Sequence, residues 1–131
     1  MNQRSQTRVD DSRPIFLQIA EAIENDILSG ALQEETQVPS TNEFAAFHRI
    51  NPATAGKGVN LLVDEGILYK KRGIGMFVAE GSKAHLVTKR LGSFETEFLA
   101  PLIAEAAKLG ITQSQLAAMI KQHSTDKEDK A

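Results

Sequence analysis

Apolar residues recur every three or four positions from Ile15 to Leu28, and this spacing predicts a first helix. Pro14 suits the first turn of such a helix, and Gly30 suits its end. The apolar stripe is expected to face a hydrophobic core. Residues 1–12, which precede it, are polar and unpatterned, so they are predicted to form a flexible amino-terminal arm.

Two shorter helices are predicted after a loop at residues 31–39. Ser40-Thr41-Asn42-Glu43 matches a capping box, so a second helix is expected to begin there and to run to about His48. Asn51 is a good helix cap and Pro52 fits the first helical position, which together predict a third helix. Its buried side is expected to be Val59, Leu61, Leu62 and Val63. Two helices this close together indicate a helix-turn-helix, although many helical proteins that do not bind DNA contain such a pair.

A β-hairpin is predicted directly after the third helix. Its strands are expected at residues 67–71 and 76–79, on either side of Arg72-Gly73-Ile74-Gly75. The glycines allow a tight turn, and three cations lie near the tip: Lys70, Lys71 and Arg72. A cationic hairpin after a helix-turn-helix is typical of a winged helix.

Helical spacing returns in residues 82–123. One apolar stripe is formed by Val87, Leu91, Phe94, Phe98, Leu102 and Leu109. Gly92-Ser93 and Pro101 interrupt the pattern, which leaves one kinked helix and two shorter helices equally open. Thr112-Gln113-Ser114-Gln115 is a second capping box and predicts a further helix. The charged residues 124–131 predict a disordered tail.

Composition narrows the class of protein. The chain has 131 residues, 24% charged and 41% hydrophobic, which suits one globular domain and leaves no room for a DNA-binding domain plus a full effector domain. The absence of cysteine excludes disulfides and thiolate metal sites. No apolar run approaches the roughly 20 residues that cross a bilayer, so no membrane partner and a cytoplasmic location are expected.

The net charge of −2 by itself argues against a nucleic-acid-binding protein. The distribution of charge is more informative, because residues 1–48 carry three Lys or Arg against eight Asp or Glu, whereas residues 49–83 carry six against three. Positive charge is therefore concentrated in the segment of the third helix and the hairpin. On charge alone, a phosphate-binding surface and a merely solvated hairpin are equally good interpretations.

The order and spacing of these elements over residues 13–80 resemble the GntR superfamily, specifically its short YtrA-like subfamily. The motifs that carry the resemblance are Pro14-Ile15-Phe16, Ser29-Gly30, Val38-Pro39-Ser40, Ile50-Asn51-Pro52-Ala53-Thr54, Glu65-Gly66-Ile67-Leu68 and Arg72-Gly73-Ile74-Gly75-Met76-Phe77-Val78. The resemblance implies a mainly α fold: a winged helix-turn-helix with a two-stranded wing over residues 13–81, then a helical dimerisation segment over residues 82–123. It also implies a homodimeric repressor that binds a palindromic double-stranded operator.

The resemblance further implies which residues contact DNA. In the family the third helix enters the major groove and the wing tip lies against the minor groove. Lys57 is then the expected base reader. The predicted DNA-binding set is Ser40, Asn42, Arg49, Asn51, Ala53, Thr54, Lys57, Arg72 and Gly73. The predicted dimerisation set is the apolar stripe from Val87 to Leu109.

Several residues depart from the family pattern. Asn42 and Lys57 stand where arginine is usual, and Met76 stands where threonine is common. Gly56 and Gly58 are unusual because a glycine inside a helix costs about 1 kcal/mol relative to alanine. The glycines could allow the helix to approach the DNA backbone closely, or they could be sequence changes without a function that the fold tolerates. The two explanations are equally good.

Catalysis finds no support in the sequence. His48, His85 and His123 are scattered, with no acidic residue at metal-ligand spacing, so neither an enzyme nor a cofactor is expected. A second hypothesis is a protein-interaction module that keeps the winged fold without strong DNA binding. It is motivated by the acidic amino-terminal third, by Asn42 and by the helix glycines Gly56 and Gly58. A small effector between the dimerisation helices is also left open, without a polar set that identifies a ligand.

Overall fold

The computed structural model describes the backbone of residues 13–130 and the side chains of residues 13–126. The expected flexible arm at residues 1–12 lies outside the described residues. The described residues divide into two compact units, with the boundary between Lys89 and Arg90. Within the described part, no helix combines the length and the apolar character that a membrane span requires.

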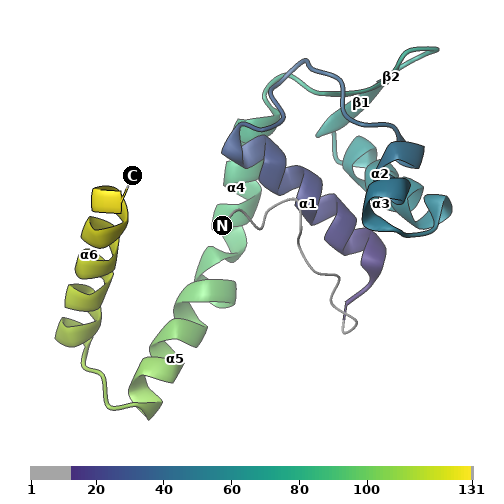
Figure 1. Ribbon diagram of the computed structural model, residues 1–131. Helices are drawn as coiled ribbons and strands as arrows, with labels where there is room; N and C mark the ends of the chain where they lie inside the picture. The colour runs from purple at the N-terminus through teal and green to yellow at the C-terminus, as the bar shows by residue number, and fades with distance from the viewer. Residues whose placement is uncertain (1–12, 131) are drawn as a thin grey trace. The chain divides into compact units, whose positions relative to one another are not determined.

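Local sequence signals define the three helices of the first unit (Figure 1). Helix α1 (Ile15–Ser29) ends at Gly30, whose φ of 89° is a left-handed conformation that glycine adopts without strain. Helix α2 (Thr41–His48) begins with the predicted capping box, because both reciprocal hydrogen bonds between Ser40 and Glu43 are present. Helix α3 (Pro52–Asp64) is capped by Asn51, whose Oδ1 accepts a hydrogen bond from the Ala53 amide at 2.7 Å.

The predicted wing is an antiparallel hairpin. Strands β1 (Leu68–Lys71) and β2 (Gly75–Val78) pair so that Leu68 lies opposite Val78 and Lys71 opposite Gly75. Residues 35–38, predicted only as loop, run along the other edge of β2. The Val38 amide donates to the Met76 carbonyl at 2.9 Å, and the Val78 amide donates to the Thr36 carbonyl at 3.0 Å. This pairing satisfies the free edge of β2 with backbone from the helix-connecting loop.

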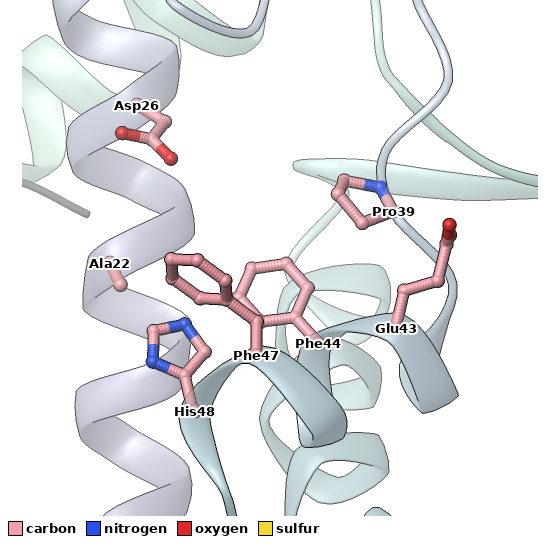
Figure 2. Close-up of a pocket in the computed structure, with 7 residues that line it drawn as sticks. All are labelled: Ala22, Asp26, Pro39, Glu43, Phe44, Phe47 and His48. Carbon is pink, nitrogen blue, oxygen red and sulfur yellow. The ribbon is translucent and has the colours of Figure 1, made fainter. Parts of the chain in front are cut away.

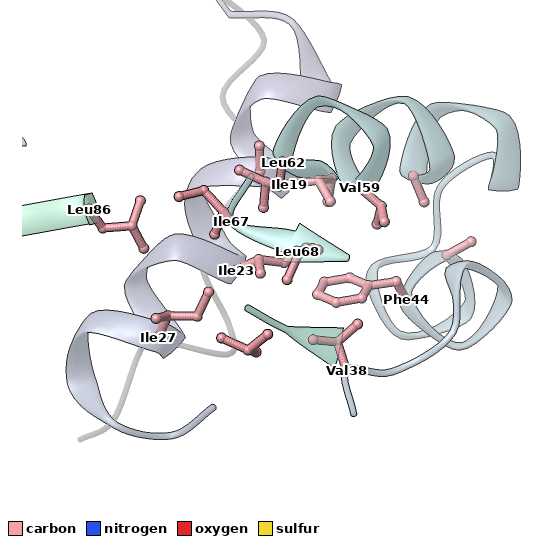
Figure 3. Close-up of a cluster of buried hydrophobic side chains, with 14 residues drawn as sticks. Ile19, Ile23, Ile27, Val38, Phe44, Val59, Leu62, Ile67, Leu68 and Leu86 are labelled. Carbon is pink, nitrogen blue, oxygen red and sulfur yellow. The ribbon is translucent and has the colours of Figure 1, made fainter. Parts of the chain in front are cut away.

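The core of the first unit lies where α1, α3 and the wing meet (Figure 3). Ile23, Leu62 and Ile67 are fully buried there, and Leu86 packs against the same cluster. Leu61 and Val63, predicted as buried, are only partly buried at its margin. The mainly α winged helix-turn-helix predicted from the sequence is therefore the observed fold.

The carboxy-terminal part is helical. Helix α4 (Ser82–Phe94), the π-helical turn η2 (Glu95–Leu99) and α5 (Ala100–Lys108) follow one another without a loop. The interruption that the sequence left open is this π turn, in which the Ala100 amide donates to the Glu95 carbonyl five residues back. Pro101 has no amide to donate and would crowd a regular helix, so a wider turn before it is the expected accommodation.

Helix α6 (Gln113–Lys130) begins at the second predicted capping box. The backbone amide of Gln115 donates a hydrogen bond to Thr112 Oγ1 at 3.1 Å. The Gln115 side-chain oxygen accepts one from the Thr112 backbone amide at 2.9 Å. The helix continues through residues 124–130, where the charged composition predicted a disordered tail. Gln122 donates to Asp126 one turn later at 3.0 Å, a helical side-chain pair of the kind that extends such a segment.

Candidate DNA-binding surface

Helix α3 has one buried side and one exposed side. Its buried residues are Ala55, Gly58, Val59 and Leu62. The predicted DNA-facing residues lie elsewhere: Asn51, Ala53 and Lys57 are exposed, and Thr54 is half-buried. These four side chains are therefore free of the hydrophobic core.

Lys57 is held by an aromatic ring. Its Nζ lies 4.2 Å from the centre of the Phe16 ring at the start of α1, within the range of a cation–π interaction. Phe16, which the apolar spacing placed in the core stripe, is only half-buried, and its ring contacts the ammonium group of the predicted base reader. Asn60 is also exposed on α3, three residues after Lys57 and on the same side of the helix by that spacing.

Gly58 is required by helix packing. A Cβ atom at this position would lie 2.6 Å from the Phe16 carbonyl oxygen and 3.2 Å from Ile19 Cβ. Neither explanation offered from the sequence therefore applies to Gly58, because the glycine lets α3 approach α1 inside the protein. A Cβ at Gly56 would meet only Thr41 Cγ2, at an ordinary 3.6 Å.

The start of α2 and the turn after it present three predicted phosphate-contacting residues. Ser40, Asn42 and Arg49 are all exposed. Ser40 Oγ accepts the Glu43 amide at 3.1 Å, and its hydroxyl hydrogen can still be donated to a phosphate. Arg49 adopts a left-handed conformation with a φ of 57°, which closes the turn between α2 and α3.

The wing tip is a tight turn. The Ile74 amide donates to the Lys71 carbonyl at 2.9 Å, and Gly73 has a φ of 77° that favours glycine. Arg72 and Gly73 are exposed. The Gln37 side chain donates to the Ile74 carbonyl at 3.0 Å and braces the tip from the adjoining loop.

The three predicted wing cations differ in their surroundings. Lys71 Nζ lies 4.3 Å from the centre of the Phe77 ring and 5.9 Å from that of Tyr69, so it covers the aromatic face of the wing. Lys70 and Arg72 are exposed. The Tyr69 hydroxyl donates to Glu35 at 2.5 Å, and this hydrogen bond raises the Tyr69 pKa.

A charged cluster lies inside the first unit, where Lys89 of α4 pairs with carboxylates on α1 and at the end of α3. Lys89 Nζ lies 2.7 Å from Glu24 Oε2 on α1 and 2.8 Å from Glu65 Oε1 at the end of α3, and Glu24 is buried. Burial disfavours the charged form of Lys89, but hydrogen bonds to both carboxylates outweigh that effect and raise its pKa. At the start of α4, Glu34 accepts the Gly81 and Lys83 amides, and these bonds lower its pKa.

The predicted dimerisation residues are all exposed. Their exposed fractions range from 41% for Val87 to 67% for Leu91. The Phe94 and Phe98 rings lie 5.7 Å apart, between centres. Four further large apolar residues are exposed in this part of the chain, namely Leu99, Ile103, Met119 and Ile120.

Comparison with known proteins identifies the family. The family model described as "Bacterial regulatory proteins, gntR family" matches residues 16–78. The HTH-type transcriptional repressor YtrA of Bacillus subtilis is 32% identical over 115 residues, which cover 88% of each chain. This chain belongs to the GntR family. The family resemblance predicted from the sequence, including its YtrA-like character, is thereby confirmed.

Solved structures of GntR regulators share the fold. A GntR family transcriptional regulator from Listeria monocytogenes has a TM-score of 0.69 and 26% identity, covering 87% of this chain and 98% of its own. The DNA-binding domain of AraR in complex with operator ORX1 has a TM-score of 0.50 and 29% identity, covering 56% of this chain and 90% of its own. This GntR member is therefore a transcription regulator with a winged-helix DNA-binding domain, and not an enzyme.

Proposed function

We propose that this GntR regulator is a cytoplasmic repressor that binds a palindromic operator as a homodimer. The observation that carries the proposal is the exposed side of α3, which presents Asn51, Ala53, Thr54 and Lys57 away from the core. The operator complex of the related AraR domain supports duplex DNA as the partner of this surface.

Each exposed group has a chemistry that suits a different part of a duplex. Lys57 brings a point charge to acceptor atoms on a guanine edge, and Ala53 suits contact with a thymine methyl group. Asn51 and Thr54 carry short hydrogen-bonding groups for phosphates or base edges. Arg72 reaches a minor groove from the wing, where Gly73 permits close approach of backbone.

The remaining predicted residues would position the domain on the backbone of DNA. Three of these residues lie at the ends of α2 and can donate hydrogen bonds to phosphate: Ser40, Asn42 and Arg49. Such contacts carry affinity without sequence preference. They would set the register in which α3 meets the base pairs.

The exposed apolar stripe supports self-association. A monomer would leave the large apolar side chains of the stripe exposed to water, namely Val87, Leu91, Phe94, Phe98, Leu102 and Leu109. A two-fold dimer would cover them and double the reading surface, which matches the symmetry of a palindromic operator.

Selection of bound sequences from random duplex DNA tests the proposal. We expect a palindrome whose half-sites lie about one helical turn, or a multiple of it, apart. Lys57→Ala should relax preference at one base pair in each half-site, at a cost of about 1–3 kcal/mol there, whereas Arg72→Ala should weaken all duplexes more evenly. Lys121→Ala removes an exposed lysine on α6. This variant is the control and should bind as the wild type does.

Salt dependence distinguishes DNA binding from the protein-interaction alternative. A surface that neutralises phosphates loses affinity steeply as salt rises, and Arg72→Ala should reduce that slope. Failure to enrich any palindrome, or equal operator affinity of the wild type and both variants, would overturn the proposal.

A further inference from the structure

A hollow of about 340 Å³ lies between α1 and α2, within the DNA-binding unit (Figure 2). Asp26 lines it from α1, and Glu43, Phe44, Phe47 and His48 line it from α2. Its size is in the range of sites that hold small organic molecules. None of these residues belongs to the predicted DNA-binding set.

Aromatic rings form one wall of this hollow. The Phe44 and His48 rings stack with centres 5.3 Å apart and planes 13° apart, and Phe47 meets His48 edge-on at 5.0 Å. Phe44 is anchored in the core with 8% exposure, whereas Phe47 remains 64% exposed. A large ring left in water beside a packed aromatic pair is a suitable surface for a flat or apolar ligand.

The charged groups that line the hollow are both carboxylates. Asp26 and Glu43 contribute them, and no lysine or arginine is among the lining residues that the structure describes. Burial lowers the pKa of His48, against the opposing effect of Asp26, so the imidazole is neutral at pH 7. Glu43 accepts the Ser40 amide at 2.8 Å in the capping box, which holds its carboxylate in place without neutralising it. The described lining of the hollow therefore places carboxylates beside an aromatic wall.

We propose that this hollow binds a small organic cation with an apolar body, such as an arylalkylamine. The aryl group would lie against Phe47 and the Phe44–His48 stack, and the ammonium group would lie toward Asp26 on α1, because Figure 2 shows Glu43 on the other side of the rings. Aromatic faces and carboxylates both attract a cation, whereas the same carboxylates repel an anionic aryl compound. The hollow shares no residue with the predicted DNA-binding set, so its existence does not depend on the proposed function.

The test is titration of 2-phenylethylamine into the ¹⁵N-labelled full chain, followed by NMR chemical shifts. We expect saturable shifts confined to the amides around residues 43–48 and Asp26, with a Kd of about 10 mM or tighter for a probe of this size. Phenylacetate, which has a similar ring and the opposite charge, should give no saturable shifts at these amides.

Two variants test the site itself. Phe47→Ala removes an exposed ring and Asp26→Asn removes one negative charge, and each should weaken amine binding by at least about fivefold. Ile74→Ala and Glu80→Gln make matched changes at exposed positions outside the hollow and should bind as the wild type does. Unaffected binding by Phe47→Ala and Asp26→Asn, shifts that map to another surface, or equal binding of phenylacetate would each overturn the proposal.

Discussion

At the scale of single residues, Lys57 and Phe16 link the exposed side of α3 to the start of α1. The 4.2 Å separation of the Lys57 ammonium from the Phe16 ring centre restricts a side chain that would otherwise be free to rotate in water. A lysine held in this way is better prepared for one geometry of contact than an unsupported lysine, because less conformational freedom is lost on binding.

A double-mutant cycle measures this coupling. Phe16→Leu keeps an apolar side chain, and Lys57→Met keeps the unbranched stem while removing the charge. We expect the two changes to be non-additive in the free energy of unfolding by about 0.5–1 kcal/mol, as measured by urea denaturation. Strict additivity would show that the ring and the ammonium group do not stabilise each other.

His48 makes stability depend on pH. Burial lowers its pKa below the ordinary value of 6.5 in the folded protein, so the unfolded chain binds more protons as the pH falls. The free energy of unfolding should therefore decrease as the pH falls below about 6.5, and His48→Gln should reduce that decrease. His85→Gln, which removes an exposed histidine on α4, is the control and should keep the wild-type dependence. Urea titrations between about pH 8 and 5.5 provide the measurement, and the same slope in wild type and His48→Gln would contradict the assignment.

At the scale of elements, two glycines on α3 have opposite consequences. Gly58→Ala places a methyl group 2.6 Å from the Phe16 carbonyl, which should destabilise the protein by about 1–3 kcal/mol in spite of the higher helix propensity of alanine. Gly56→Ala meets nothing closer than 3.6 Å and should stabilise the protein by up to about 1 kcal/mol. Thermal or urea unfolding of the two variants checks the pair. A stabilising Gly58→Ala would disprove the close approach of α1 and α3.

The elements that could be predicted from the sequence are those set by short-range chemistry. The capping box at Ser40, the Asn51 cap with Pro52, and the glycine turn of the wing all act within a few residues, so their outcome does not depend on distant packing. Those signals located α2, α3 and the hairpin to within a residue or two. The apolar spacing of α3 identified which side of the helix would be buried. The DNA-binding residues predicted on its other side are accordingly solvent-accessible.

The features that escaped prediction depend on contacts between distant parts of the chain. The role of Gly58 depends on Phe16, which lies 42 positions earlier, and the pairing of residues 35–38 with β2 joins a loop to the wing. The hollow beside Phe47 requires α1 and α2 together. A single sequence shows none of these juxtapositions, because residue spacing reports local periodicity and not tertiary neighbours.

At the scale of the whole molecule, the exposed apolar side chains of the carboxy-terminal part determine the expected assembly. Phe98→Glu places a charge in the stripe and should convert the proposed dimer into a monomer, as measured by sedimentation equilibrium. Operator affinity should then fall by at least about tenfold, because each half-site is bound separately.

Thr96→Glu is the matched control for that experiment. It adds the same charge two residues earlier at an exposed position outside the stripe, and it should remain dimeric. A wild-type chain that sediments as a monomer at all concentrations would refute the assembly. Dissociation of both variants alike would show that added charge, and not the stripe, is responsible.

The close fit of α3 against α1 at Gly58 has a consequence for engineering new sequence preferences. A library intended to retarget this regulator can randomise positions 53, 54, 57 and 60, because each of them is at least partly solvent-accessible. Position 58 must stay invariant in such a library, because any larger residue there meets the backbone of a neighbouring helix. Recognition helices grafted from regulators that have a bulkier residue at this position would need a compensating change in α1 before their new specificity could be assayed.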